Sequence, residues 1–166
     1  MAQAARPSTT AQDPLDLIER LALVHDWGFE RSAEDELVMS AAGQAGDLAL
    51  SLIWRADLES LHIACQFAGK VPPQRREEMG RLINLVNEQL LYGHFDLWRQ
   101  DGSVMFRNNL LLSGGAEAGE AQCEQLIRIA IETCERYHAP FQFAIWAGAP
   151  AERAITSNFF SAAGQA

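Results

Sequence analysis

Residues 36–67 read ELVMSAAGQAGDLALSLIWRADLESLHIACQF. Apolar and polar residues alternate in three segments of this stretch, and two four-residue interruptions separate the segments. Alternation with period two is the pattern of a half-buried strand, and short interruptions of this kind form turns. The turn lengths place Met39 opposite Leu50 and Leu50 opposite Cys65, so the three apolar sets share one face. We predict a three-stranded antiparallel meander with one buried face.

The opposite face of this meander is mostly polar, but Val38 and Ile53 interrupt its polar residues. We therefore expect this second face to be exposed to solvent or only partly covered by other parts of the protein. A short extended piece at residues 29–31 is expected to precede the meander.

A hairpin is predicted over residues 93–112, around the dipeptide Asp101-Gly102. This dipeptide is a strong hairpin signal, and a two-residue turn of this type demands a positive φ at both residues. Such a turn places Trp98 opposite Met105. Both of these large side chains then lie on the polar face of the hairpin.

Three helices complete the predicted fold. Asp13 at a capping position, followed by Pro14, predicts the start of a first helix that spans residues 13–26. Apolar residues at helical spacing predict a second helix over residues 74–91. The last helix begins after Gly115 and meets Pro140, so residues 141–147 fit either a kinked continuation of the helix or a strand. The resulting order is α-β-β-β-α-β-β-α, which belongs to the α+β class.

Composition favours one globular domain, because 48% of the 166 residues are hydrophobic and only 21% are charged. We expect a single domain over residues 13–156, with flexible tails at residues 1–12 and 157–166. Three cysteines are an odd number, which is untypical of a small secreted protein held by disulfides. We expect neither an export signal nor a membrane-spanning helix, and we assign the protein to the cytoplasm.

The charge and the motifs exclude several functions. The net charge of −9 repels a phosphate backbone, so nucleic acid is not an expected partner. Cys123 and Cys134 share a helix face but lie roughly 16 Å apart along the axis, too far for a disulfide. The histidines come from different predicted elements and lack metal-ligand spacing. We expect no catalytic residue, no metal site and no cofactor.

Apolar residues on the otherwise polar sheet face are the strongest candidates for a contact with another protein, since exposed aromatic and aliphatic side chains mark interfaces. The candidate contact residues are Val38, Ile53, Trp98 and Met105.

Several strings, in their order along the chain, resemble the YbjN domain family, which is described as sensory transduction regulators of bacteria. The strings are Asn84-Leu85-Val86-Asn87, Tyr92-Gly93-His94-Phe95-Asp96-Leu97, Asp101-Gly102-Ser103-Val104 and Gly148-Ala149-Pro150-Ala151-Glu152-Arg153-Ala154. The resemblance covers residues 14–155. It implies a type III secretion chaperone-like fold, in which chaperones pair into dimers and bind extended segments of partner proteins. The family has no accepted catalytic residues to transfer to this chain.

The expected function is that of a non-enzymatic cytoplasmic bacterial protein, a homodimer that contacts an unidentified partner protein as a chaperone-like module or as a regulator of sensory transduction or stress. The alternative is a small-molecule-binding protein or an undescribed enzyme. Its site would be a cleft between the sheet and the last helix, with His94, Asp96 and Arg107 at the mouth.

Overall fold

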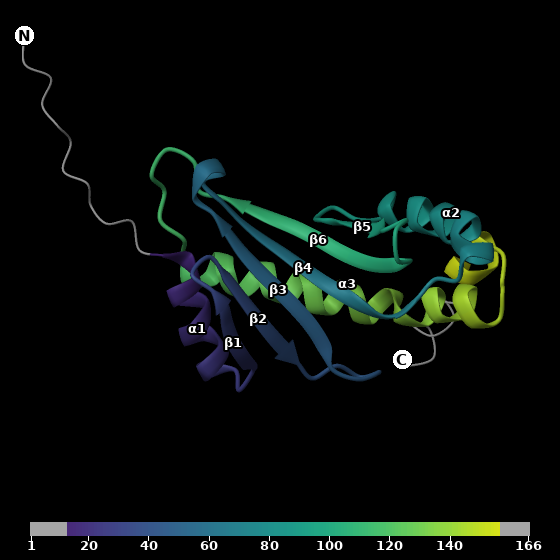
Figure 1. The fold of residues 1–166 in the computed structure, drawn as a ribbon, viewed down its shortest axis with the longest axis horizontal. Coiled ribbons are helices and arrows are strands. Elements are labelled where there is room, and N and C mark those ends of the chain that lie inside the picture. The colour runs from purple at the N-terminus through teal and green to yellow at the C-terminus, as the bar shows by residue number, and fades with distance from the viewer. Residues whose placement is uncertain (1–12, 157–166) are drawn as a thin grey trace, which may run out of the picture.

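The computed structural model describes residues 13–156, so the two predicted tails lie outside the described residues. The elements in chain order are α1 (Pro14–Val24), β1 (Gly28–Ala33), β2 (Glu36–Ala41), β3 (Leu48–Arg55), η1 (Ala56–Leu58), β4 (Ser60–Lys70), η2 (Pro73–Arg75), α2 (Arg76–Asn87), β5 (His94–Leu97), β6 (Ser103–Leu111) and α3 (Glu120–Trp146). Residues 151–156 form a further helical turn. Figure 1 shows these elements as one sheet with α3 running along it.

The strands form one antiparallel sheet of six strands in the order β1-β2-β3-β4-β6-β5. The predicted register of the meander is confirmed, because Met39 pairs with Leu50 and Leu50 pairs with Cys65. The inward-facing residues of these strands are buried and form the core against the helices.

The extended piece predicted at residues 29–31 is a full strand, β1, so the meander has four strands rather than three. Arg31 pairs with the buried Leu37 and therefore lies on the inner face, where alternation predicts an apolar residue. Its guanidinium is neutralised by α1, with Nη1 at 2.9 Å from Asp16 Oδ1 and 3.1 Å from Glu19 Oε1. Asp13 binds the same group. These ion pairs with α1 allow an arginine on the inner face of β1, where the alternating pattern of a strand would place an apolar residue.

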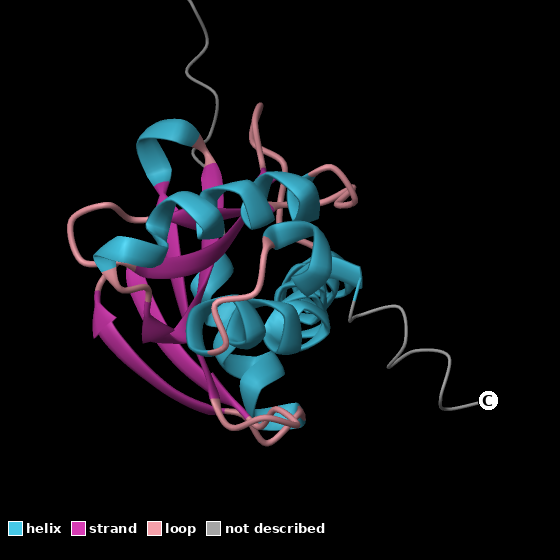
Figure 2. Cartoon of the chain, turned by 90° about the vertical axis from the view of Figure 1, so that its right-hand side faces the viewer, coloured by secondary structure: helices cyan, strands magenta, loops and turns pink. Residues whose placement is uncertain are grey.

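Helices cover the inner face of the sheet. Figures 1 and 2 show α3 along one side of the strands; α1 packs against α3, β1 and β3, and α2 packs against β5 and α3. The ring of Phe95 on β5 lies 5.9 Å from that of Tyr137 and 4.9 Å from that of Phe141, both on α3. These aromatic contacts tie the edge of the sheet to the longest helix.

The register predicted for the hairpin is wrong by two residues. His94 pairs with Arg107 rather than with Asn109, and the loop runs from Trp98 to Gly102. Gly102 has a positive φ of 79°, but Asp101 does not, so the two-residue turn does not form. A shift of two residues keeps every side chain on its predicted face, because the period of a strand is two.

The side chain of Asp101 accounts for the longer loop. Its Oδ1 accepts a hydrogen bond from the backbone N–H of Ser103 at 3.0 Å, and its Oδ2 accepts one from the hydroxyl of the same residue at 2.6 Å. This local turn competes with the two-residue hairpin.

The first helix begins where it is predicted, with Asp13 as its N-cap and Pro14 as its first residue, whereas the second and third helices begin later than the patterns indicate. A 3-10 turn precedes α2, and α2 ends at Asn87 rather than at residue 91. The last helix continues through Pro140 to Trp146, so residues 141–146 are helical and the strand alternative is wrong.

Candidate interaction surface

The outer face of the sheet, opposite α1 and α3, holds a shallow depression of about 510 Å³. Small side chains cause it, since Ala49, Ser51 and Ala64 occupy the central strands where larger residues would fill the space. A depression of this size on the sheet face suits the side chains of a partner molecule.

All four contact residues predicted from the sequence line this depression. Val38 on β2 is 40% exposed and Trp98 is 47% exposed, while Ile53 and Met105 are partly covered. The two-residue error in the hairpin register did not affect this prediction, because it left Trp98 and Met105 on the same face. The structure thus brings together residues that lie up to 67 positions apart, from Val38 to Met105.

The backbone of Trp98 is held in place. Its N–H donates to the carbonyl of Ser103 at 2.8 Å, and its carbonyl accepts from the N–H of Gly102 at 2.8 Å. An exposed aromatic side chain on a fixed backbone loses little conformational entropy when a partner covers it.

Polar residues around the depression are paired with one another, which sequence reasoning did not predict. His62 Nδ1 lies 2.8 Å from Asn109 Oδ1, and the hydroxyl of Ser51 donates to Glu36 Oε1 at 3.1 Å. Because these groups keep their partners when water leaves, covering this face does not leave them unsatisfied.

The cluster of His94, Asp96 and Arg107 also forms, but not where it was expected. Asp96 Oδ2 lies 3.0 Å from Arg107 Nη1 and 3.4 Å from His94 Nε2. The neighbouring Phe95 points toward α3, so the cluster lies on the opposite, outer face of the sheet. The expected cleft between the sheet and the last helix is therefore not at this cluster, because aromatic rings fill that space.

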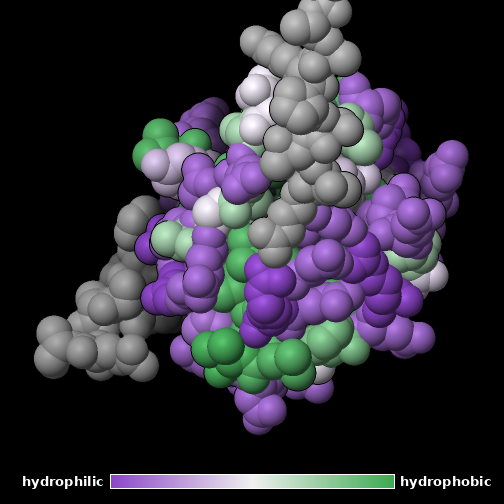
Figure 3. Space-filling view, turned by 90° about the vertical axis from the view of Figure 1, so that its left-hand side faces the viewer, coloured by the Kyte–Doolittle hydropathy of each residue, from purple (hydrophilic) through white to green (hydrophobic). Residues whose placement is uncertain are grey.

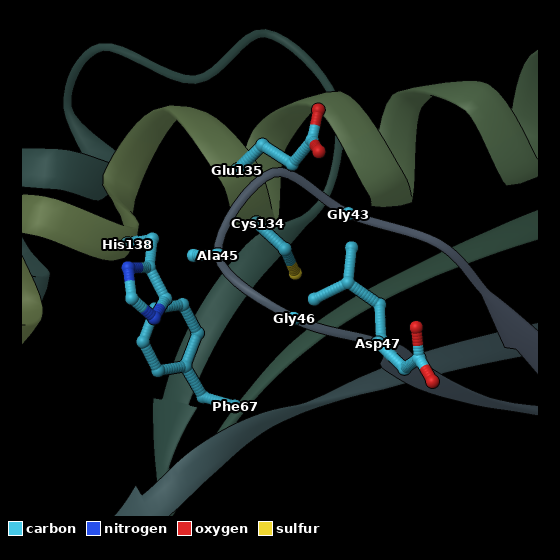
Figure 4. Close-up of a pocket in the computed structure, with 9 residues that line it drawn as sticks. Gly43, Ala45, Gly46, Asp47, Phe67, Cys134, Glu135 and His138 are labelled. Atoms are coloured by element: carbon cyan, nitrogen blue, oxygen red, sulfur yellow. The ribbon is translucent and has the colours of Figure 1, made fainter.

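A small pocket of about 50 Å³ lies under the β2–β3 loop, beside α3 (Figure 4). Glu135 holds the loop above it, since its Oε1 accepts from the backbone N–H of Gln44 at 2.8 Å. Cys134 and His138 project toward the pocket from α3. The space admits a few water molecules but not an organic ligand.

The cysteines serve as packing residues. A hydrogen bond with Cys65, together with burial, raises the pKa of the Cys134 thiol, and burial raises the pKa of Cys123 to about 11. All three thiols are buried and free. Neutral buried thiols are poor nucleophiles and poor metal ligands. The contact between Cys65 and Cys134 could not be predicted, because it joins a strand to a distant helix.

The described part of the chain offers neither a metal site nor a membrane-spanning helix. Residues 13–156 contain no group of three or more His, Cys, Asp and Glu side chains that could hold a metal ion. None of the helices described has the length and apolarity needed to cross a membrane.

Exposed apolar residues also occur away from the sheet face. Leu23 and Val24 at the end of α1 are 71% and 75% exposed, and Figure 3 shows a hydrophobic patch among mostly hydrophilic residues at the α1 end of the molecule. Exposed aliphatic residues are common in soluble proteins, so this pair does not by itself define a binding surface.

The antiparallel sheet with helices on one face and an open, partly apolar second face makes this an α+β protein, and its fold is type III secretion chaperone-like. Residues 14–143 match the YbjN family, described as "Putative bacterial sensory transduction regulator". The chain belongs to the YbjN family. Among curated proteins, none matches the sequence.

Two crystal structures share the fold. YbjN, described as a "putative transcription regulator" from E. coli, is 11% identical, with a TM-score of 0.54 over 73% of this chain and 85% of that chain. The ExsC-ExsE complex contains a chain that is 14% identical, with a TM-score of 0.52 over 77% of this chain and 92% of that chain. At these identities the likeness shows the fold alone.

Two of the sequence strings that resemble the YbjN family contain residues with a clear structural role in this chain. The side-chain amide of Asn87 pairs with the backbone of Phe95, accepting from its N–H at 2.8 Å and donating to its carbonyl at 3.1 Å. Gly93 has a positive φ of 67°, and a Cβ there would lie 2.7 Å from the carbonyl oxygen of Arg107 and against the ring of Phe106. Both strings thus fix the edge strand β5 against α2 and β6.

Proposed function

We propose that this protein is a non-enzymatic interaction module, chaperone-like or regulatory, that contacts a partner protein through the outer face of its sheet. The observation that carries the proposal is the depression lined by Val38, Ile53, Trp98 and Met105. Membership of a family described as sensory transduction regulators supports it, as does the occurrence of the same fold in the ExsC-ExsE complex.

Trp98 is the proposed anchor of the contact. Tryptophan is enriched among the residues that dominate binding energy, and truncating such an anchor costs about 2 kcal/mol or more. Val38, Ile53 and Met105 would add apolar contacts along the rest of the depression, from β6 across to β2, while the paired polar groups at the edge keep their own hydrogen bonds. The partner therefore needs an apolar segment that fits the depression more than it needs charges.

We further propose that the protein is a homodimer and acts in the cytoplasm. Free, buried thiols are compatible with a reducing compartment. Light scattering coupled to size-exclusion chromatography measures the mass in solution directly, and a monomer at tens of micromolar would contradict the dimer without affecting the proposed partner contact.

Affinity capture from the host lysate, followed by mass spectrometry, tests the partner contact. Trp98→Ala should lose the captured protein, and Ala64→Arg should lose it as well, because an arginine fills the depression. Trp146→Ala is the matched control, since Trp146 is 78% exposed at the end of α3 and does not line the depression. The proposal fails if the purified partner binds the wild type, Trp98→Ala and Ala64→Arg equally well.

A further inference from the structure

A second concave site lies between α2 and the β5–β6 hairpin, and the proposed function does not use it. This groove has a volume of about 690 Å³, within the range of pockets that hold small ligands. Arg76, Gly80, Ile83 and Asn84 line it from the helix, and Leu97 and Arg99 line it from the hairpin.

Gly80 creates much of the space. It lies inside α2, where glycine is less favourable than alanine by about 0.5–1 kcal/mol. No heavy atom lies within 4 Å of the position that a Cβ would occupy, so the packing of the chain itself does not require glycine here. The residue leaves a gap in the helix surface between Arg76 and Asn84, which are four positions away on either side.

Two positive charges in the groove have no carboxylate partner among residues 13–156. Arg76 donates to the backbone carbonyls of Val71 and Arg99, and it forms no ion pair with a described residue. The guanidinium of Arg99 is exposed and forms none either. The link from Arg76 to the carbonyl of Arg99 also fixes the hairpin loop beside the helix.

The two acidic residues that line the groove, Glu77 and Asp96, have carboxylates that are already paired, that of Asp96 on the outer face of the sheet. Glu77 Oε1 accepts from Arg81 at 2.7 Å, and Asp96 Oδ2 accepts from Arg107 at 3.0 Å. The groove therefore has an excess of positive charge, although the chain as a whole has a net charge of −9. Its walls also include the apolar side chains of Ile83 and Leu97.

We propose that this groove binds a small organic anion that carries a phosphate or carboxylate group. Arg76 and Arg99 would bind the charged group, because guanidinium donors match the geometry of both anions. The exposed side-chain amide of Asn84 supplies a further donor. The apolar part of the ligand would lie against Ile83 and Leu97, over the gap left by Gly80.

Backbone amide shifts measured by NMR test this proposal on the full chain. Inorganic phosphate, phenyl phosphate and benzoate are titrated separately at constant ionic strength. Saturable shifts at the amides of Gly80 and Asn84 are expected, and the response to phenyl phosphate against benzoate distinguishes a phosphate site from a carboxylate site. Tighter binding of either aromatic anion than of inorganic phosphate is expected from the apolar walls.

Variants assign the effect to the groove. Arg99→Gln should weaken binding about tenfold or more, since a hydrogen bond to a charged group is lost. Gly80→Leu should abolish binding by filling the gap, and it should leave the helix folded because leucine is a better helix former. Arg20→Gln removes an exposed arginine on α1 and should bind like the wild type. The proposal is overturned if no probe saturates, or if Arg99→Gln and Gly80→Leu bind as well as Arg20→Gln does.

Discussion

The backbone of the edge strand β5 is hydrogen-bonded by one side chain of α2 on the side away from β6, and removing that side chain gives a sharp test of the fold. Asn87, at the end of α2, forms two hydrogen bonds with the backbone of Phe95, at 2.8 Å and 3.1 Å. Its amide therefore takes the place that a neighbouring strand would occupy, which also protects the edge from pairing with another chain. Asn87→Ala removes both bonds and leaves the N–H and carbonyl of a buried residue without partners.

The expected loss of stability follows from these contacts. Each hydrogen bond contributes about 1 kcal/mol net, and a buried group left unsatisfied adds a penalty of about 1 kcal/mol or more. Alanine recovers a few tenths of a kcal/mol at most through its helix propensity, since residue 87 is the last of the helix. The free energy of unfolding should fall by about 2–3 kcal/mol, and Tm by about 5–10 °C.

Urea unfolding followed by tryptophan fluorescence measures this loss, with a matched control on the same helix. Asn84→Ala makes the same chemical change one turn earlier, where the side chain is exposed, and it should change stability by less than about 0.5 kcal/mol. The two variants should have the same m value as the wild type. If Asn87→Ala destabilises the protein no more than Asn84→Ala does, the assigned role of the Asn87 amide is wrong.

Three further outcomes are expected. Gly80→Ala should raise the free energy of unfolding by about 0.5–1 kcal/mol in the same urea assay, and a destabilised variant would show that the helix needs glycine there. Gly93→Ala should lower it by more than about 2 kcal/mol because the site combines positive φ with a backbone clash, whereas Gly28→Ala, which has open space, should cost much less. Hydrogen bonds from Ser103 and the nearby Lys70 lower the pKa of Asp101 from about 3.8 to about 2, so its contribution is complete above pH 4 and is lost as the pH falls toward 2. The difference in Tm between the wild type and Asp101→Asn should therefore shrink across that interval, and a constant difference from pH 7 to pH 2 would contradict the assignment.

The meander could be predicted because all of its information is local. Period-two alternation assigns each residue to a face, and a short turn leaves one register that keeps the apolar faces together. The pairing of Leu50 with both Met39 and Cys65 follows from these two facts alone. The candidate contact residues followed from the same alternation, because a residue such as Val38 is assigned to its face by its position in the strand.

The predictions for β1 and for the hairpin register failed because a polar side chain in each forms a contact that the hydrophobic pattern does not show. Arg31 lies on the inner face because carboxylates from α1 surround it, so β1 lacked the apolar alternation of a strand. The hairpin register failed for a different reason, since the carboxylate of Asp101 binds Ser103 and lengthens the loop. In both cases a specific polar contact outweighed the general pattern.

The sequence by itself determined the α+β class, the faces of the strands and which apolar residues lie on the outer face of the sheet, because hydrophobic periodicity is a property of neighbouring residues. Only the tertiary structure decided which of these residues meet. The depression on the outer face exists because Ala49, Ser51 and Ala64 become neighbours across strands. The groove beside α2 exists because the hairpin loop brings Arg99 to Arg76, 23 positions earlier in the chain. Concavity and unbalanced charge depend on packing between distant segments, which no local pattern encodes.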